Sequence, residues 1–312
     1  TKGYRDDGRR NSGCNVVTMK VLHIISGLKQ GGAESALFRL VTHAKDGTQH
    51  SVISLIGMGA FGSRLQDAGV NTHALNMTEG KLTIKGLLKL WRLIRKVDPD
   101  VVQTWMYHAD LIGGLVARLA GYKHVFWGVV HFNLDPTVTS KSTRITAKLC
   151  AFFSFLIPAK ILSCSVEAVK SHTAIGYAKD KFLAIPLGYN LAEFYPDEYL
   201  RVQQRAEWEV SDDSTIIGFV GRWDPQKDHA NLLKAFAMVR AEYPKLVCVL
   251  IGPGMDSSNV DLSDVIEKYL GRDSNVYTLG LVDSIPAAMN AIDVHVLPSL
   301  GEAFPNVVAE AM

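Results

Sequence analysis

Cysteine is scarce in this sequence, and the motifs that would use it are missing. Four cysteines occur among 312 residues, none stands in a C-x-x-C pair, and their spacing fits no zinc site. Three of the four lie within apolar runs, where a buried free thiol is the ordinary role. We therefore expect a reducing compartment, and no structural metal or disulfide framework.

Long apolar runs and a strong excess of charge are absent too. The longest lipid-like stretch, residues 149–159, covers only about half of the roughly 20 residues that a membrane-spanning helix needs. Lys and Arg total 33 against 31 Asp and Glu, which leaves a formal net charge of +2. Dedicated nucleic-acid binders are normally strongly basic, so we expect no nucleic-acid partner.

What the sequence does have is ordinary globular composition and enough length for two domains. Hydrophobic residues make up 47% and charged residues 21%. A typical domain has about 150 residues, so two domains are expected. Residues 1–18 are polar and precede the first methionine, and they are expected to be a disordered or extraneous extension outside the fold.

From Met19 onward, short apolar runs alternate with amphipathic segments. This pattern is typical of parallel sheets that are covered by helices on both faces. It predicts a first Rossmann-like domain over 19–187, a linker over 188–213 with a short helix near 201–209, and a second Rossmann-like domain over 214–312. The expected strands are residues 20–26, 51–56, 101–105, 125–130, 161–165, 182–185, 215–220, 246–251, 276–279 and 294–297.

The predicted fold class is α/β, with two Rossmann-like domains whose parallel sheets face a central cleft. Ligands of such sheets bind at the carboxyl ends of the strands. The sequence stops at Met312 inside an expected helix, and only four strands precede that point in the second domain. We therefore expect the second domain to be incomplete and the chain to be a fragment.

A glycine pair follows the first expected strand, in the segment GLKQGGAE. Gly31 and Gly32 precede an amphipathic helix, where close backbone approach and free N–H groups suit an anion. The alternative is a tight turn without a ligand. The segment is neither a P-loop nor a dinucleotide fingerprint, which disfavours a dehydrogenase.

Two cations follow the first strand of the second domain, in the segment GRWDPQKDHAN. Arg222 leaves the carboxyl end of that strand, and Lys227 stands near the start of the next helix. Two permanent cations at this position suit a diphosphate. The alternative is a pair of solvated charges that Asp224 and Asp228 neutralise.

Two carboxylates flank an expected helix start in the last segment, PSLGEAFPNVVAEAM. Glu302 and Glu310 are eight residues apart, so on one helix they would not form a catalytic dyad. Pro305 favours a first helical turn, which leaves Glu302 in the loop and Glu310 inside the helix. A sugar and a ribose on either side of a phosphate would suit this arrangement. The alternative is a helix start with two surface glutamates.

Together, these three segments resemble retaining glycosyltransferase family 4, which has the GT-B architecture. Their order and spacing fit that family from Met19 to Met312, and residues 280–282 and 285–293 resemble its base-binding loop and the helix that follows. Residues 251–254 (IGPG) stand where the family has a glycine loop. A nucleotide-sugar epimerase of similar architecture is not expected to combine the three segments.

The resemblance implies a role for each matching residue. Arg222 and Lys227 would grip the donor diphosphate, Glu302 the hydroxyls of the donor sugar, and Glu310 the ribose, while Gly32 would let backbone reach the donor. The other donor-binding residues implied are Gly31, Gly252, Leu281, Val282, Ala303, Phe304, Pro305 and Asn306.

Two histidines follow strands of the first domain and so are expected at the cleft. His131 stands at the position of the family's active-site histidine, and His108 is a candidate on the acceptor side. For each, a purely structural role is the alternative. Asp98-Pro99-Asp100 matches a metal-binding D-x-D pattern, but it precedes its strand and therefore lies at the wrong end of the sheet. We expect no metal and no cofactor.

Residues 81–97 contain six basic and no acidic residues. A basic stripe runs beside an apolar stripe of Leu87, Trp91, Ile94 and Val97, a pattern that suits contact with anionic lipid. The alternative is an ordinary helix whose apolar side faces the core.

The resemblance implies a metal-independent glycosyltransferase that moves a sugar from a nucleoside-diphosphate sugar to a glycan or lipid-linked acceptor, with retention of configuration. We expect it in polysaccharide or cell-surface glycan synthesis, in the cytoplasm or peripheral at the inner membrane face. The alternative is a non-catalytic nucleotide-sugar-binding protein or an inactive fragment of such an enzyme.

Overall fold

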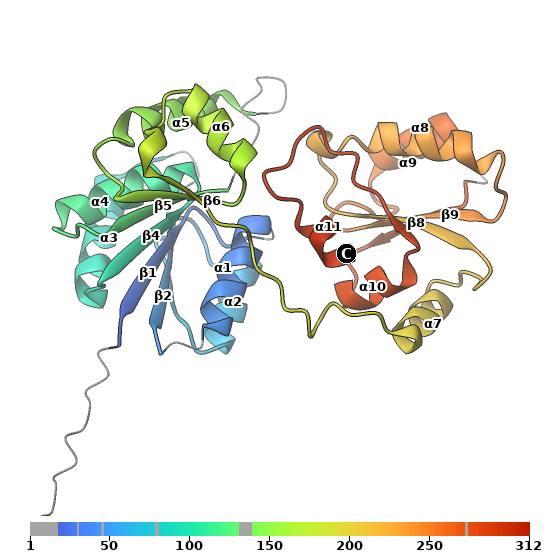
Figure 1. Cartoon of the computed structure of the whole chain (residues 1–312), viewed down its shortest axis with the longest axis horizontal. Helices are drawn as coiled ribbons and strands as arrows, with labels where there is room; N and C mark the ends of the chain where they lie inside the picture. Colours follow the sequence, from blue (N-terminus) through green and yellow to red (C-terminus); the bar gives the residue numbers. More distant parts are fainter. Residues whose placement is uncertain (1–17, 30, 45–46, 79–80, 131–138, 272–273) are drawn as a thin grey trace, which may run out of the picture.

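The chain folds into two α/β domains that lie side by side (Figure 1). The computed structural model describes residues 18–312 except 30, 45–46, 79–80, 131–138 and 272–273. One domain holds a seven-stranded sheet and the other a four-stranded sheet, and every strand pair is parallel. The predicted α/β class with two parallel-sheet domains is thereby confirmed.

The first sheet has the strand order β3-β2-β1-β4-β5-β6-β7. Its strands are β1 (Lys20–Ile25), β2 (Gln49–Ser54), β3 (Asn71–Ala74), β4 (Val101–Trp105), β5 (Val125–Val129), β6 (Lys160–Ser163) and β7 (Phe182–Ala184). Its helices are α1 (Gly32–His43), α2 (Gly59–Asp67), α3 (Ile84–Val97), the π-helix η1 (Ala109–Gly113), α4 (Gly114–Leu119), α5 (Lys141–Phe153), α6 (Val166–Ala174) and the 3-10 turn η2 (Lys179–Lys181).

Each face of this sheet has its own core. Along β1, Leu22 and Ile24 pack in one cluster with residues of α3, α4 and α5, whereas Ile25 packs in another with residues of α1 and α2. Alternate residues of a strand point to opposite faces, so helices cover the sheet on both sides. This two-sided burial explains why the central strands read as continuous apolar runs.

One strand was not predicted from the sequence. β3 has only four residues, NTHA, and pairs with β2 alone at the edge of the sheet. An edge strand buries less of its surface than a central one, so its sequence needs no apolar run.

The second sheet has the order β10-β9-β8-β11. Its strands are β8 (Thr215–Val220), β9 (Leu246–Ile251), β10 (Val276–Gly280) and β11 (Val294–His295). Its helices are α7 (Glu198–Glu207), the 3-10 turn η3 (Pro225–Lys227), α8 (His229–Arg240), α9 (Val260–Leu270), α10 (Ile285–Ala291) and α11 (Asn306–Ala311).

Helix α7 lies within the expected linker, yet it is part of the second domain. Its Arg205 is 1% exposed and donates to three carbonyl oxygens, those of Ala291, Asp212 and Ser214, at 3.0 to 3.2 Å. Arg205 also pairs with Asp293 at 2.7 Å. Partial burial raises the pKa of Asp293, but hydrogen bonds from the Ile216 amide and from two arginines outweigh this effect and lower it.

Replacing this buried arginine should destabilise the second domain. We expect Arg205→Met to lower the free energy of unfolding by about 3 kcal/mol, because it leaves Asp293 and three carbonyl oxygens short of their donor. Urea denaturation followed by circular dichroism measures the loss. The control is Lys245→Ala, which breaks an exposed ion pair with Asp213 and should change little. An equal effect of both variants would contradict the structural role of Arg205.

Candidate active site

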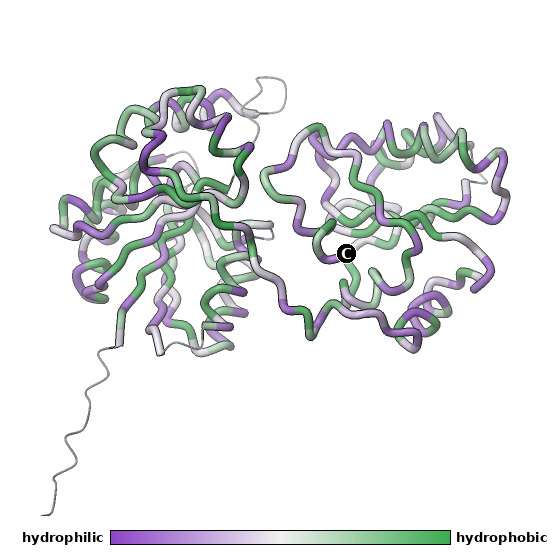
Figure 2. Tube along the Cα trace, in the orientation of Figure 1, coloured by the Kyte–Doolittle hydropathy of each residue, from purple (hydrophilic) through white to green (hydrophobic). Residues whose placement is uncertain are grey.

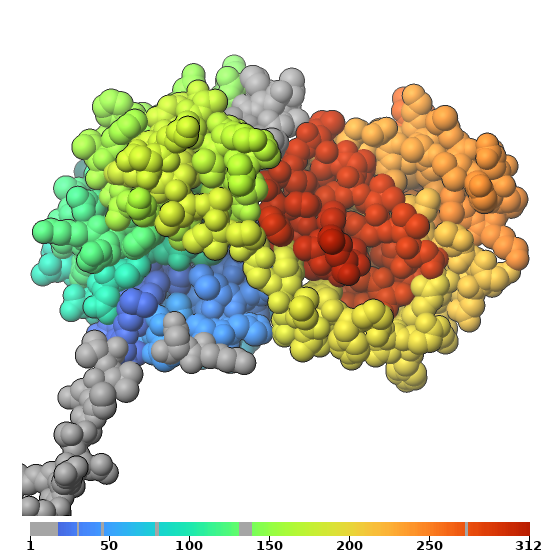
Figure 3. All heavy atoms as spheres, viewed as in Figure 1, coloured from blue at the N-terminus to red at the C-terminus, as the bar shows by residue number. Residues whose placement is uncertain are grey.

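A cleft of about 630 Å³ lies between the two domains, and the carboxyl ends of strands from both sheets line it. The first domain contributes residues that follow β1, β4, β5, β6 and β7, and the second contributes residues that follow β8, β9, β10 and β11. In each sheet the chain order reverses within this set, between β1 and β4 and between β8 and β11. Open parallel sheets bind ligands at such points. Figure 3 shows the last segment of the chain against the first domain.

Most of the residues that the sequence singled out line this cleft. Arg222, Lys227 and Glu302 are all present in its wall. So are the nine other predicted donor-binding residues Gly31, Gly32, Gly252, Leu281, Val282, Ala303, Phe304, Pro305 and Asn306. Segments from both ends of the fold, from Gly31 to Asn306, therefore meet at one place, as the order of the motifs predicts.

Three predicted residues have a different outcome. Glu310 is not among the described residues that line the cleft, and its carboxylate lies 3.9 Å from Arg39 on α1. His108 precedes η1 and is likewise not among the lining residues. His131 lies outside the described residues, so its role stays a prediction.

Arg222 lies between carboxylates of both domains. Its Nε donates to Asp224 Oδ2 at 3.0 Å, and its guanidinium is about half exposed. Burial raises the pKa of Glu34, in the first turn of α1, and the charge of Arg222 partly offsets that rise. Glu34 belongs to the GGAE segment, but no sequence pattern indicates that it faces a cation of the other domain.

Lys227 and Glu302 form an ion pair at the second side of the cleft. The Lys227 ammonium donates to Glu302 Oε1 at 2.5 Å, and both side chains are mostly buried. The sequence predicts a diphosphate ligand for one and sugar hydroxyls for the other. Their contact places these two expected roles next to each other, as they are in a molecule where the sugar is bonded to the diphosphate.

The turn that carries Lys227 is fastened to the loop that carries Glu302. Gln226 Nε2 donates to the carbonyl oxygen of Gly301 at 2.5 Å, and the Leu300 amide donates to the carbonyl oxygen of Gln226 at 2.9 Å. Asp224 caps η3 by accepting from the Gln226 amide. The two loops therefore form one unit, although about 75 residues separate them in the sequence.

The buried His229 packs against aromatic side chains beside this unit. His229 stacks on Trp223 with ring centroids 4.6 Å apart and lies edge-on to Phe219 at 4.8 Å. Burial lowers the pKa of His229 to about 4, so the ring is neutral at pH 7. The His229 ring therefore contributes packing beside the turn that carries Lys227 without adding a positive charge to the site.

Two glycines allow close backbone approach at the cleft. A Cβ on Gly252 would lie 2.3 Å from the carbonyl oxygen of Gly221, and Gly252 has φ +132°, which side chains rarely adopt. A Cβ on Gly32 would lie 2.9 Å from Nδ2 of Asn306, which belongs to the other domain. Gly32 therefore lets the two domains touch beside the cleft.

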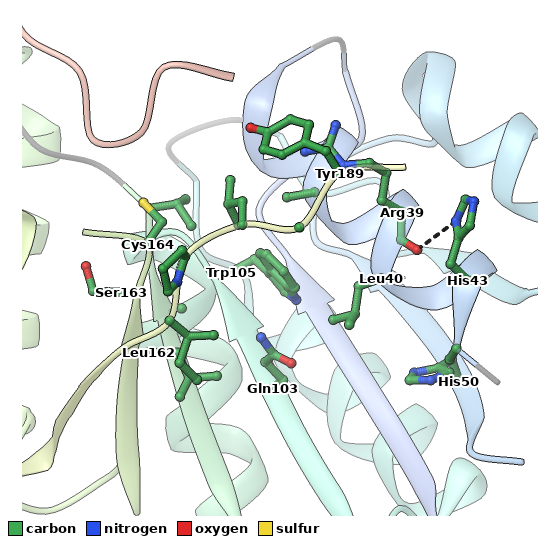
Figure 4. Close-up of a pocket in the computed structure, with 18 of the residues that line it drawn as sticks. Arg39, Leu40, His43, His50, Gln103, Trp105, Leu162, Ser163, Cys164 and Tyr189 are labelled. Carbon is green, nitrogen blue, oxygen red and sulfur yellow. Dashed lines mark hydrogen bonds between the residues drawn. The ribbon is translucent and has the colours of Figure 1, made fainter. Parts of the chain in front are cut away.

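A larger pocket of about 1040 Å³ lies in the first domain and shares Ala36, Val130, Cys164 and Leu187 with the cleft (Figure 4). Its other walls include α1 and the segment after β7. None of the site residues predicted from the sequence lines it among the described residues. The cleft, and not this pocket, is the candidate active site.

The two aspartates of the D-x-D segment lie at the amino end of β4. Asp100 accepts from the Lys20 amide at 2.7 Å, and Asp98 accepts from the Tyr122 hydroxyl at 3.0 Å. Neither lines the cleft. Within the part of the chain that the structure describes, no three His, Cys, Asp or Glu side chains gather as metal ligands do.

Comparison with known families agrees with this geometry. The model described as Glycosyltransferase Family 4 matches residues 30–193, more than half of the chain. The chain belongs to glycosyltransferase family 4. The model described as Glycosyl transferases group 1 matches residues 214–312 of this family 4 chain, which are the second domain.

Individual relatives are more distant. The chain is 27% identical over 231 residues to an Escherichia coli UDP-Gal:alpha-D-GlcNAc-diphosphoundecaprenol alpha-1,3-galactosyltransferase. This match covers 73% of this chain and 59% of the relative. It is 23% identical over 237 residues to the Staphylococcus aureus capsular polysaccharide biosynthesis glycosyltransferase CapM, with 73% and 60% covered. This family 4 chain thus spans about three fifths of both relatives.

A solved structure shows the same fold. HepE of Anabaena, crystallised with UDP and glucose, superposes with a TM-score of 0.80 at 19% identity, over 94% of this chain and 78% of HepE. At this identity the likeness establishes the GT-B arrangement of the family 4 chain.

Adding a methyl group at Gly252 should strain the floor of the cleft. We expect Gly252→Ala to lower the free energy of unfolding by about 1 to 3 kcal/mol, because alanine resists its positive φ and its Cβ would meet the Gly221 carbonyl. Chemical denaturation measures the loss. Gly57→Ala is the control, since no atom lies within 4 Å of the added Cβ. Equal stability of both variants would contradict this account of the cleft floor.

Proposed function

We propose that this protein transfers a sugar from a nucleoside-diphosphate sugar to a glycan or lipid-linked acceptor, with retention of configuration. The observation that carries the proposal is the meeting of Arg222, Lys227 and the 303–306 turn in one interdomain cleft. The names of the two relatives support a lipid-linked or polysaccharide acceptor, since one names a diphosphoundecaprenol and the other capsular polysaccharide.

The proposed chemistry relies on charge placed around the leaving group. As the bond between the anomeric carbon and the diphosphate oxygen breaks, negative charge develops on the diphosphate. Arg222 and Lys227 stabilise that charge, and a site closed between two domains strengthens the interaction because water is excluded. The acceptor hydroxyl attacks from the side that the diphosphate leaves, and its proton passes to a diphosphate oxygen, so configuration is retained.

The diphosphate must replace carboxylates that already face both cations. In the structure Arg222 is paired with Asp224 and Lys227 with Glu302. When the donor binds, Glu302 is freed to accept hydroxyl groups of the sugar, which lies directly beside the diphosphate. The ion pair thus holds Glu302 close to the place where it would bind the hydroxyl groups of the donor sugar.

Removing either cation should weaken the stabilisation of the leaving group. We expect Arg222→Ala and Lys227→Ala each to lower donor turnover roughly 100-fold, as loss of one transition-state donor does elsewhere. A panel of nucleotide sugars, assayed for release of the nucleoside diphosphate, measures turnover. Lys234→Ala on α8 is the control.

Two results would count against the proposal. Unchanged turnover in both variants would remove the cations from the mechanism. Tight nucleotide binding by the wild-type chain without turnover of any donor in the panel would favour the alternative, a non-catalytic nucleotide-sugar-binding protein.

We further propose that the first domain contacts an anionic membrane, through a surface wider than residues 81–97. The apolar stripe predicted there mostly serves the core, since Ile94 is fully buried and Leu87 and Val97 pack against the first core cluster. Trp91 is exposed. Within the described residues, every helix falls short of the length or apolarity that a bilayer-spanning segment requires.

Exposed apolar side chains instead extend over three helices, α3, α4 and α5, and the turn that follows α5, on one face of the first sheet. Leu119 of α4 is 74% exposed and Phe152 of α5 is 69% exposed. The whole set comprises Ile84, Leu88, Trp91, Leu119, Ile145, Leu149, Phe152, Phe155 and Leu156. Figure 2 shows hydrophobic and hydrophilic positions alternating along α5.

Charge favours an anionic lipid surface as the partner. Residues 81–160 hold twelve Lys and Arg against four Asp. On α5, Lys141, Arg144 and Lys148 stand beside the exposed Ile145 and Leu149. Apolar side chains that enter the lipid boundary, flanked by lysine and arginine near the headgroups, are typical of helices that lie on a membrane.

Changes on α5 and in the turn that follows it should release the protein from anionic vesicles. We expect the double variant Phe152→Ser, Phe155→Ser and the triple variant Lys141→Glu, Arg144→Glu, Lys148→Glu each to weaken binding to phosphatidylglycerol vesicles roughly tenfold or more. Vesicle flotation measures binding, and Met238→Ser on α8, also exposed, is the control. Absence of wild-type binding, or equal binding by all variants, would contradict the proposal.

A further inference from the structure

Three segments of the chain meet at the side chain of Asn306. Its Oδ1 accepts from Arg39 Nη2 of α1 at 3.1 Å and from the Tyr189 hydroxyl at 2.5 Å. Arg39 lies on α1 of the first domain, and Tyr189 lies in the segment that joins the domains. Asn306 is the first residue of α11 in the second domain. Figure 4 shows Arg39 and Tyr189 side by side. This contact therefore links the two domains and the segment between them.

Arg39 also approaches the carboxylate of Glu310, which lies on α11 as Asn306 does. Its Nη1 lies 3.9 Å from Glu310 Oε1, and the two side chains are only 20% and 13% exposed. Two further contacts fix the guanidinium: Nη1 donates to Ser35 Oγ at 3.0 Å, and the group lies 4.8 Å from the Tyr189 ring centroid. One arginine thus reaches two residues of α11 from the opposite domain.

The charge of Arg39 favours the ionised form of Glu310. Burial raises the pKa of Glu310, and the charge of Arg39 offsets only part of that rise. Tyr189 is in contact with this cluster, and burial raises its pKa to about 12, so it is neutral at ordinary pH. The Cys164 thiol lies near Tyr189, and burial raises its pKa as well. Helix α10, which packs against α11, has the sequence IPAAMNA and no titratable side chain. His295 lies on β11, the strand that precedes this segment, and partial burial lowers its pKa.

We propose that Arg39 is a positioning residue of the donor site, which anchors Asn306 and Glu310 from the opposite domain and so makes donor binding depend on the closed arrangement of the two domains. The inference rests on the proposed function and extends it with the ribose-binding role that the family resemblance implies for Glu310. Glu310 is not among the described residues that line the cleft, whereas Asn306 belongs to the 303–306 turn that does. Arg39 itself touches neither substrate nor reacting atoms in this account.

The coupling follows from the geometry. If the domains move apart, Glu310 loses its cation and Asn306 loses the donor that Arg39 supplies. A ligand that needs both residues in place binds the closed arrangement better, and it therefore shifts the population toward that arrangement. Tyr189 extends the network to the interdomain segment and stacks on Phe304 of the cleft, with ring centroids 6.2 Å apart.

The test is nucleotide affinity as a function of pH, measured on the whole chain. Isothermal titration with UDP and with GDP at about pH 5.5 and about pH 8 compares wild type, Arg39→Ala, Arg39→Lys and Tyr189→Phe. The control is Arg95→Ala, an arginine of α3 that also bonds a carbonyl oxygen and lies over an aromatic ring, but away from the cleft. Thermal unfolding of each variant shows that the fold is retained.

The expected result is a loss that depends on pH. Without Arg39, the rise that burial gives the pKa of Glu310 is no longer partly offset, so the carboxyl group takes up a proton at higher pH than in wild type and loses its acceptor role as the pH falls. We expect Arg39→Ala to weaken nucleotide binding roughly tenfold at about pH 5.5 and only a few-fold at about pH 8. Arg39→Lys should restore the wild-type pH profile, and Tyr189→Phe should weaken binding without changing that profile.

Other outcomes overturn the inference. If Arg39→Ala binds nucleotide as wild type does at both pH values, or if its loss is equal at both, Arg39 does not position Glu310. If Arg39→Lys fails to restore the profile, the charge is not what matters. If wild type binds neither nucleotide, the proposed function fails first, which is a different result from a failure of Arg39 alone.

Discussion

The candidate site depends on the attachment of one loop to another within the second domain. The turn after β8 and the loop after β11 come from adjacent strands of the sheet, and hydrogen bonds through Gln226 hold them together. The ion pair of Lys227 with Glu302 completes the attachment. Without it, a cation and a carboxylate that the proposed chemistry needs side by side would be separate exposed charges, each free to move.

Electrostatics in the cleft is balanced rather than one-sided. Both candidate cations have carboxylate partners, and Glu34 of the first domain adds negative charge near Arg222. A site with unpaired buried cations would be costly to fold, because desolvation penalises isolated charge. The balance also means that an anion gains only where it offers more than the carboxylates do, and a diphosphate, with more charge and more acceptor oxygens, meets that condition.

Much of the fold could be predicted from the sequence, because the central strands are buried on both faces and read as apolar runs. The position of most candidate donor-side residues at the cleft, although not that of Glu310, could be predicted as well, since each motif follows a strand and is local: the Arg222–Lys227 segment and the Glu302 segment are both contiguous. β3 escaped prediction because an edge strand needs no apolar run. Arg39 and Tyr189 escaped it because nothing in a helix surface or a linker indicates which residue of another domain it will meet.

The uneven distribution of lysine and arginine along the chain has a consequence for the whole molecule. Residues 81–160 hold 12 Lys and Arg against 4 Asp and Glu, whereas the chain as a whole has a formal charge of only +2, so the remaining residues carry an acidic excess. In the proposed membrane contact, a negatively charged plane would attract residues 81–160 and repel the acidic remainder, and it would turn the protein before it arrived. The orientation at first encounter would then be decided by long-range fields, before any side chain made contact.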